Sequence, residues 1–277
     1  MRHLSGRSRL RITALASLAM AAGVLAACGD SDDAQKLTFE LGKGGAITGP
    51  KSAESGLAEI TLENNSGAEG DLQLIRTEGD HSVDELVEAF EGTGSGKPLP
   101  DWFFGGGGVG STGDGKGATV TQVLQPGTYF AVDTESRPDA EKVAALEVTG
   151  DSSEETVESD TTVTAGEYVF ESDAPLPAGT NEIVFDNIGA QPHHLLASKL
   201  IGDATAEDVE TFFKTEKGRP PLSEKGTQAT AVLEGGEGQL VTLDLEPGRY
   251  ALYCFISDRQ GGPPHALKGM VDEIEVE

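Results

Sequence analysis

Apolar and polar residues alternate in several short stretches of the chain, which is the pattern of half-buried β-strands. Clear stretches begin at Glu59 and at Glu182, and two more cover residues 120–124 and 240–245. The last two each lead through a Pro-Gly turn into a further predicted strand. Shorter apolar stretches at 37–41, 168–170 and 271–276 complete the pattern. The chain is therefore predicted to be mainly β.

Two short segments have the helical pattern instead. Ser82 stands three residues before Glu85, and Thr205 stands three residues before Asp208, each before apolar residues at helical spacing. A hydroxyl residue followed at that distance by an acid is a capping box, the start signal of a helix. We expect one short helix in each half of the chain.

The two halves are copies of one unit. Residues 59–64 match 182–187 and residues 82–90 match 205–213, both at an offset of 123. Residues 126–129 match 247–250 at an offset of 121. A nearly constant spacing over three separate segments indicates a tandem duplication. Each copy is predicted to be an antiparallel β-sandwich with one inserted helix.

The N-terminus reads as a secretory signal. A basic start without acids precedes an apolar run from Ile12 to Leu25, and two alanines precede Cys28. This order describes an export signal, and the apolar run is shorter than a membrane-spanning helix needs. The segment around Cys28 resembles the lipobox of bacterial lipoproteins, which implies a lipid on that cysteine. The predicted organisation is signal peptide 1–27, tether 28–36, first sandwich 37–150, linker 151–163 and second sandwich 164–277.

The charge restricts the partners. The full chain carries −27, and without residues 1–27 it holds 16 Lys and Arg against 47 Asp and Glu, a net charge of −31. Such a charge argues against nucleic-acid binding and favours a basic or cationic partner. Once Cys28 is lipidated, Cys254 is the one thiol left, so no intramolecular disulfide is expected.

Four residues of the second copy form a metal-binding pattern. His193 follows a predicted strand, Cys254 ends another, and His265 and Met270 lie before the last strand. Two imidazoles, a thiolate and a thioether are the ligand types of a mononuclear type 1 copper site. Met270 is also the single methionine that remains after residue 27.

Residues 165–277 resemble a cupredoxin of the plastocyanin or azurin kind. The resemblance rests on Pro192-His193, Pro247-Gly248-x-Tyr250, Cys254, Pro264-His265 and Gly269-Met270. It implies a Greek-key β-sandwich that binds one type 1 copper through His193, Cys254, His265 and Met270. It places the first ligand directly after the proline, so His193 is preferred to His194, and it implies that electrons leave through His265.

This chain departs from the plastocyanin pattern in two places. Ten residues separate Cys254 from His265, a longer gap that resembles nitrite-reductase-like copper domains. In the first copy Asp133 stands where Cys254 does, and Asp71 aligns near His193. The first sandwich is therefore expected to bind no metal.

The resulting prediction is a one-electron carrier anchored by lipid to the extracytoplasmic face of a cell membrane, in the periplasm. No second copper site or catalytic group is visible in the sequence, so the chain is expected not to be an enzyme. Two alternatives remain open: a copper capture or delivery protein, and a metal-free surface binding module. The redox partner is not identified.

Overall fold

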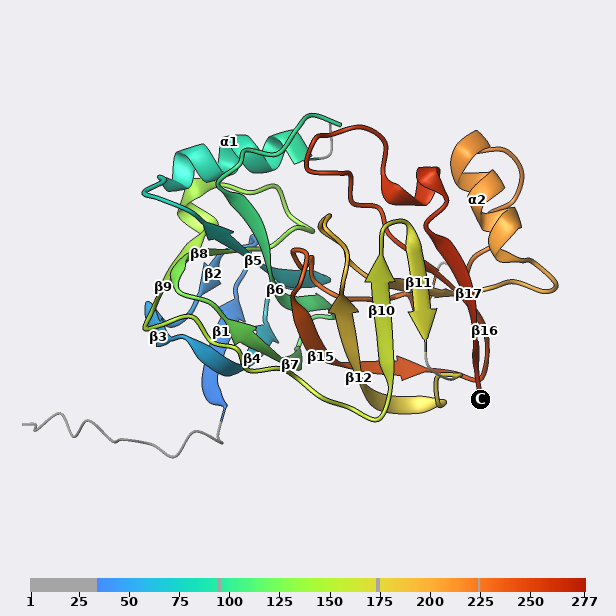
Figure 1. Cartoon of the computed structure of the whole chain (residues 1–277), viewed down its shortest axis with the longest axis horizontal. Coiled ribbons are helices and arrows are strands. Elements are labelled where there is room, and N and C mark those ends of the chain that lie inside the picture. Colours follow the sequence, from blue (N-terminus) through green and yellow to red (C-terminus); the bar gives the residue numbers. More distant parts are fainter. Residues whose placement is uncertain (1–33, 94–95, 173–174, 224) are drawn as a thin grey trace, which may run out of the picture. The chain divides into compact units, whose positions relative to one another are not determined.

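Three β-sheets carry the fold in the computed structural model, which describes residues 34–93, 96–172, 175–223 and 225–277 (Figure 1). The first copy contains β1 (Gln35–Leu41), β2 (Ile47–Thr48), β3 (Ser52–Glu54), β4 (Gly56–Asn64), β5 (Gly70–Thr77), α1 (Val83–Thr93), β6 (Phe103–Thr112), β7 (Lys116–Leu124), β8 (Gly127–Val132), a 3₁₀ helix (Ala140–Lys142) and β9 (Ala144–Thr149). The second contains β10 (Thr162–Gly166), β11 (Val169–Ser172), β12 (Gly179–Asn187), β13 (Leu196–Lys199), α2 (Ala206–Thr215), β14 (Gln228–Ala229), β15 (Gly238–Leu245), β16 (Gly248–Tyr253), a 3₁₀ helix (His265–Lys268) and β17 (Val271–Val276).

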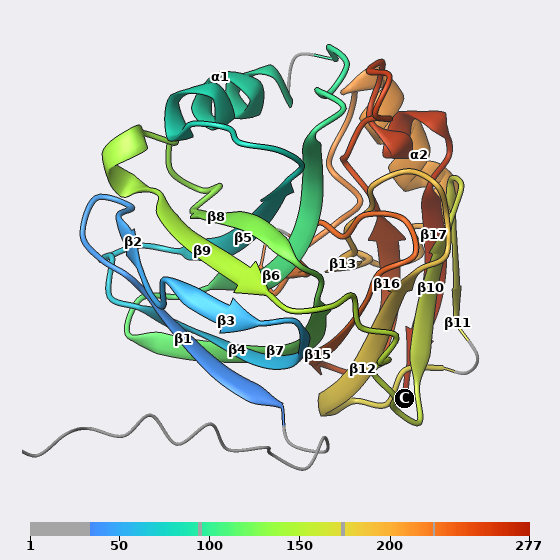
Figure 2. The same ribbon diagram turned by 60° about the vertical axis from the view of Figure 1, so that its left-hand side comes forward.

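One sheet of eight strands runs through both copies, in the order β11-β10-β12-β15-β7-β4-β1-β2. The copies meet in it where β15 pairs antiparallel with β7, with Gln239 opposite Gln122 (Figure 2). A five-stranded sheet, β3-β9-β8-β5-β6, belongs to the first copy, and a four-stranded sheet, β14-β13-β16-β17, to the second. Each copy is therefore a two-sheet sandwich, as the sequence pattern predicts.

The strands form because their alternate residues are buried. In β1, Leu37, Phe39 and Leu41 are almost completely buried, while the residues between them are exposed. Burying one such side chain contributes about 1.5–3 kcal/mol. Most buried apolar residues of the two copies belong to one cluster that spans both and includes Cys254 and Met270. Two smaller clusters contain Leu86 of α1 and Val209 of α2.

Both predicted helices are present, and both begin with the predicted capping box. The Ser82 hydroxyl accepts the backbone N–H of Glu85, and the backbone N–H of Ser82 donates to the Glu85 carboxylate. Thr205 and Asp208 make the same two bonds at α2. The fold class predicted from the sequence is confirmed in these respects.

The pairing of the opening strands differs from the prediction. The pattern predicts antiparallel sheets, but β1 lies parallel to β4 and β10 lies parallel to β12. Between the two parallel strands the chain crosses to the opposite sheet, where β3 pairs with β9 in the first copy and Leu176 bridges Val276 in the second. The chain therefore enters the first sheet again in the same direction. The opening strand of the second copy is β10, which the sequence pattern does not predict, whereas the predicted stretch 168–170 overlaps β11. Tyr168, in a left-handed backbone conformation (φ 64°), lies in the turn between these two strands.

A run of glycines in β6 lets the two copies approach closely. A Cβ atom built on Gly110 would lie 1.8 Å from the carbonyl oxygen of Ala229 in the second copy. Beside this strand, the Gln239 side-chain amide donates to the carbonyl of Gly108 and to the side chain of Gln122. Residues 113–115 then form the turn into β7.

The predicted boundaries of the copies stay a prediction, because residues 34–277 form one compact unit. Residues 150–161 contain no helix or strand and lie where the sequence places the linker. The predicted signal peptide and Cys28 fall outside the described residues. In the described part of the chain, no helix is both long and apolar enough to cross a bilayer.

Candidate metal centre

Three of the four predicted ligands converge at one end of the second sandwich. Nδ1 of His265 lies 3.0 Å from Nδ1 of His193 and 3.6 Å from Sγ of Cys254. These are the only three His, Cys, Asp or Glu side chains in the described residues that meet closely enough to hold one ion. All three are fully buried.

Backbone hydrogen bonds hold each of the three residues in place. His193 exchanges both of its backbone hydrogen bonds with Leu233, at 3.0 and 2.9 Å. Cys254 directly follows β16, and its carbonyl accepts the N–H of Ala266 at 2.7 Å. The N–H of His265 donates to the carbonyl of Ile256 at 2.8 Å. The cluster is therefore built on sheet and 3₁₀-helix backbone, not on a loose loop.

The fourth predicted ligand, Met270, lies next to this cluster in the chain and in the core. Its backbone N–H donates to the carbonyl of His265 at 3.0 Å. Its side chain is fully buried in the same apolar cluster that contains Cys254. A weak axial thioether beside two imidazoles and a thiolate is the type 1 arrangement.

The cluster fits a single first-row metal ion. Imidazole nitrogen binds such an ion at about 2.0 Å and thiolate sulfur at about 2.3 Å, so two donors on one ion lie at most about 4 Å apart. The separations of 3.0 Å between the two imidazole nitrogens and 3.6 Å between Nδ1 of His265 and Sγ of Cys254 fall inside this limit. Soft sulfur combined with imidazole selects copper or zinc, and the His₂Cys set with methionine selects copper of type 1.

Burial keeps the metal-free ligands uncharged. It raises the pKa of the Cys254 thiol to about 12. It lowers the pKa of His193 to about 4, an effect that the neighbouring His265 reinforces, and it also lowers the pKa of His265. At neutral pH both imidazoles are therefore neutral and ready to bind, whereas the thiol must lose a proton to bind.

A carboxylate orients the His265 ring from outside. Asp258 Oδ1 lies 3.0 Å from Nε2 of His265, so this nitrogen carries the ring proton and Nδ1 faces the cluster as an acceptor. The Tyr168 hydroxyl donates to the same oxygen at 2.9 Å, and Lys268 pairs with Oδ2. Burial raises the pKa of Asp258, but the bonds from Lys268, Tyr168 and His265 outweigh it and leave this pKa lowered. A carboxylate behind a ligating imidazole is a common feature of metal sites.

The His265 ring, through which the resemblance implies that electrons leave, exposes none of its surface. Tyr168 lies edge-on to it, with ring centres 5.2 Å apart, and Asp258 covers Nε2. The exit of electrons through His265 stays a prediction.

The long segment between Cys254 and His265 binds to the first copy. Arg259 stacks over the Phe104 ring at 4.6 Å and donates to the carbonyl of Pro100, both in the first copy. It also pairs at 3.0 Å with Glu234 of its own copy, and this carboxylate accepts the N–H of Gly105 in the first copy. The N–H of Leu99 donates to the carbonyl of Arg259 at 2.8 Å. The length of this segment thus has a structural reason, since it reaches across to the first sandwich.

His194 lies outside the cluster. Its Nε2 accepts the backbone N–H of Phe255 at 2.9 Å, which ties it to the residue after Cys254. Burial lowers its pKa to about 3, and its neighbours His193 and His265 add to the effect. The structure therefore brings His193, and not His194, to the other two donors.

The equivalent place in the first copy contains two carboxylates, each of which accepts a backbone N–H from this part of the chain. Asp133 follows β8 as Cys254 follows β16, and it accepts the N–H of Asp71 at 3.1 Å. Burial raises the pKa of Asp71 to about 7, although hydrogen bonds from Thr134 oppose this. No His, Cys or Met takes part here among the described residues.

Sequence reasoning missed Asp258, Tyr168, Lys268 and Arg259. Nothing in the sequence separates Asp258 from the other 46 acidic residues. Tyr168 lies far from the ligands along the chain and reaches them through the turn between β10 and β11. Their roles depend on packing between distant segments.

Comparison with known proteins gives structural neighbours only. A scan against models of protein families finds no match, and no curated protein matches the chain. Reduced auracyanin from Roseiflexus castenholzii is 24% identical over 42% of this chain and 94% of its own, with a TM-score of 0.29. Auracyanin A from Chloroflexus aurantiacus, titled a "blue" copper protein, is 21% identical over 42% and 99%, with a TM-score of 0.26. Copper nitrite reductase from Nitrosomonas europaea is 15% identical over 88% and 94%, also at 0.26.

The nitrite reductase corrects one expectation. The sequence analysis expects a chain that is not an enzyme, but this solved structure, which aligns with 88% of the chain, is one. A laccase aligns over the same share, at 12% identity and a TM-score of 0.25. The expectation is therefore withdrawn, and at these identities no reaction is assigned in its place. The predicted cupredoxin-like fold and copper ligand types stand, because the two-sheet copies and the His-Cys-His cluster are both present.

Proposed function

We propose that this chain is an exported type 1 copper protein that exchanges single electrons, with His193, Cys254, His265 and Met270 as its copper ligands. The observation that supports the proposal is the convergence of two imidazole nitrogens and one thiol sulfur within 3.6 Å at His265. Copper held by this donor set supplies a reversible one-electron couple.

The protein's own contribution is a rigid and dry ligand set. All four ligand side chains are fully buried, and backbone hydrogen bonds fix the three donors whose positions define the cluster. Asp258 holds the His265 ring in one tautomer. Ligands that cannot move keep one geometry in both oxidation states, which favours fast electron exchange over metal release.

The test is the visible spectrum of residues 29–277 after addition of Cu(II). We expect an intense band from thiolate-to-copper charge transfer, and Cys254→Ser should abolish it. Met270→Leu is the matched variant, because it removes the weak ligand and should shift the band rather than remove it. A colourless wild-type protein with an unchanged melting temperature would refute copper binding, since an ion bound only by the native state must stabilise it.

Voltammetry separates electron exchange from copper capture. Electron exchange predicts a reversible one-electron wave of the loaded protein. A capture or delivery protein would instead give no reversible wave and would lose its copper readily to a chelator.

Lipid anchoring at the extracytoplasmic face is the second part of the proposal. The basic start, the short apolar run and Cys28 after two alanines support it. In bacterial cells, Cys28→Ala should prevent incorporation of labelled palmitate and move the chain from the membrane to the soluble fraction. Cys254→Ser is the control, and it should leave the label and the fraction unchanged.

A further inference from the structure

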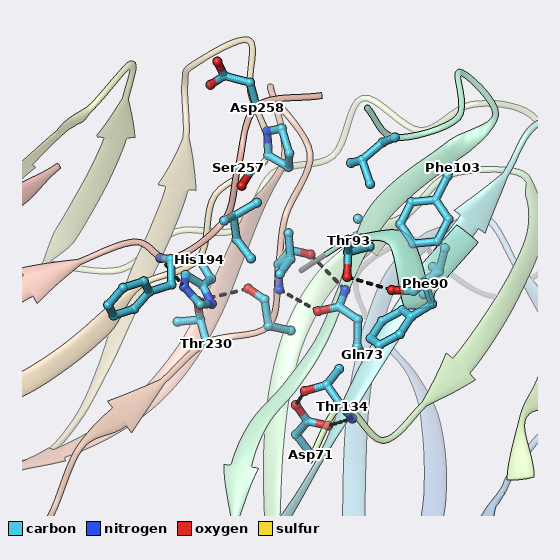
Figure 3. A pocket seen from close by; sticks show the side chains of 18 of the residues that line it. Asp71, Gln73, Phe90, Thr93, Phe103, Thr134, His194, Thr230, Ser257 and Asp258 are labelled. Carbon is cyan, nitrogen blue, oxygen red and sulfur yellow. Dashed lines mark hydrogen bonds between the residues drawn. The ribbon is translucent and has the colours of Figure 1, made fainter. Parts of the chain in front are cut away.

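One ring nitrogen of the metal cluster has no hydrogen-bond partner among the described residues. It is Nε2 of His193, in a ring that exposes none of its surface, whereas Nδ1 of the same ring faces His265. The next residue, His194, has other surroundings, because it borders a cavity with Gln73 of the first copy on the opposite side (Figure 3). Nε2 of His193 lies instead beside Gly189.

Binding of a metal ion changes what this nitrogen requires. The His265 ring carries its proton on Nε2, toward Asp258, so its Nδ1 is an acceptor. Two acceptors at 3.0 Å would repel each other, so the proton of the neutral His193 ring lies on Nδ1 in the metal-free protein. A metal ion takes the lone pair of this Nδ1, and the ring proton must then lie on Nε2. A buried N–H without an acceptor is unfavourable, so the metal-loaded protein needs an acceptor at Nε2.

Two side-chain oxygens adjoin this nitrogen across Gly189. A Cβ atom built on the glycine would lie 3.3 Å from Nε2 of His193. The same atom would lie 2.9 Å from Oε1 of Glu167 and 3.3 Å from Oδ1 of Asn187. Oδ1 of Asn187 already accepts the N–H of Gly189 at 3.1 Å. Oε1 of Glu167 accepts the N–H of Ala190, which keeps this carboxylate beside the ring, and a carboxylate accepts several hydrogen bonds.

The first copy has the same turn with a side chain in place of the glycine. Asn64 and Asn187 are equivalent, because each accepts the N–H two residues later and donates to the carbonyl four residues later. The residue two positions after the asparagine is Ser66 in the first copy and Gly189 in the second. A position without a side chain therefore distinguishes the copy that contains the metal cluster.

The acid differs between the copies as well. In each copy the opening strand pairs with the strand that ends in the asparagine, and two residues beyond the paired position stand Lys43 in the first copy and Glu167 in the second. Burial lowers the pKa of His193 to about 4, His265 adds to this effect, and the Glu167 carboxylate opposes it. The charge of Glu167 therefore acts on this ring already in the metal-free protein.

We propose that Glu167 is a positioning residue for His193, whose Nε2–H it accepts when Nδ1 binds the metal. Asp258 acts in the same way on His265. Glu167 is exposed, so its side chain is free to rotate toward Nε2, and Gly189 places no side chain in the way. The ring stays neutral and changes only the nitrogen that carries its proton. The inference rests on the proposed function, because it takes His193 as a ligand.

The test is binding of Zn(II) to residues 29–277, which involves no redox chemistry. Competition with a chromophoric chelator measures the affinity. Glu167→Ala should weaken binding about tenfold or more, the usual effect of losing a partner of a ligating imidazole. Glu167→Gln keeps an acceptor oxygen and should recover part of the loss. Glu171→Ala removes an exposed acid of β11 and should bind like the wild type.

A glycine substitution tests the geometry. In Gly189→Ala the methyl group would lie against both Nε2 of His193 and the Glu167 carboxylate, so it should keep the two apart. We expect this variant to lose about as much affinity as Glu167→Ala, and the double variant to lose less than the two losses together. Gly113→Ala, in a turn of the first copy, is the control.

The tautomer of His193 is a readout that a purely structural role would not change. Long-range proton–nitrogen NMR spectra of protein labelled with ¹⁵N-histidine should show a protonated Nδ1 without metal and a protonated Nε2 with Zn(II). In Glu167→Ala the Nε2 proton should exchange with solvent about tenfold faster, because one hydrogen bond to a charged group is lost.

The outcomes separate this inference from the proposed function. If the wild type binds Zn(II) through Nδ1 of His193, and Glu167→Ala changes neither the affinity nor the proton exchange, this inference alone is overturned. A wild type that binds no Zn(II), or binds it without His193, would overturn the inference together with the proposed ligand set. Melting temperatures of the metal-free variants show that each has folded.

Discussion

Asp258 and His265 form a carboxylate–imidazole pair in which Oδ1 accepts from Nε2 at 3.0 Å. This bond leaves Nδ1 of His265 as the nitrogen that faces His193 and Cys254. The acid thus determines which nitrogen of the ring is available to a metal, although it lies seven positions before the histidine in the chain. Partners of this kind commonly affect metal affinity by an order of magnitude or more.

Removing the acid should weaken copper binding. We expect Asp258→Ala to lower the affinity for Cu(I) about 10–100-fold, the range found for such outer partners. Asp258→Asn keeps an acceptor oxygen and should lose less. Competition with a chromophoric chelator measures both, and Asp244→Ala, at an exposed acid of β15, is the control. An affinity of Asp258→Ala within twofold of the wild type would show that the pair has no positioning role.

Metal binding should release one proton at pH 7. The pKa of the Cys254 thiol is raised to about 12, so the thiol is protonated at this pH. The pKa of His193 is lowered to about 4, so this ring is already neutral and releases nothing. The apparent affinity should therefore rise about tenfold for each pH unit near neutrality.

Calorimetry with Zn(II) in buffers of different ionisation enthalpy counts that proton without redox chemistry. Cys254→Ser should release none. A wild-type count near zero at pH 7 would mean that the metal-free protein already holds a thiolate, contrary to the effect of burial.

The ion pair of Arg259 with Glu234 should stabilise the whole unit, because the Glu234 carboxylate also accepts the N–H of Gly105 in the first copy. Arg259→Ala leaves this carboxylate without its basic partner, and both side chains are largely buried. We expect a loss of about 2–3 kcal/mol in the free energy of unfolding, below the range for completely buried pairs because some solvent contact remains. Urea denaturation measures it. Arg137→Ala, which breaks the exposed pair with Glu91, should leave the midpoint close to that of the wild type.

A double-mutant cycle with Glu234→Gln tests the assignment. If the two residues interact, the combined variant should lose less than the two single losses together. Additive losses would show that Arg259 acts through its other contacts, such as the Phe104 ring.

The glycines of β6 should tolerate no side chain where the copies meet. In Gly110→Ala the new Cβ would overlap the carbonyl oxygen of Ala229, 1.8 Å away, so one copy must move. Overpacking of this kind costs about 1–3 kcal/mol, and backbone rather than a flexible side chain is in the way. Gly113→Ala is the matched control, because its Cβ would meet only the Lys116 side chain at 3.7 Å. Thermal unfolding compares the two, and equal melting temperatures would contradict the close approach.

The sequence by itself determined the local structure and the chemistry of the donors. Alternation of apolar residues located most strands, and the capping boxes at Ser82 and Thr205 located both helices. These are short-range properties, since a strand or a helix start depends on residues a few positions apart. The types of the ligands could also be predicted, because the chain contains few cysteines and methionines besides Cys254 and Met270.

Only the tertiary structure decided what surrounds those donors. The shared sheet, the parallel opening strands and the burial of His265 all arise where distant segments pack together. Asp258 gains its role because the chain after Cys254 turns back over the cluster, beside the turn that contains Tyr168. A pattern of neighbours along the chain contains no information on such contacts, because their free energy depends on burial and distance in three dimensions.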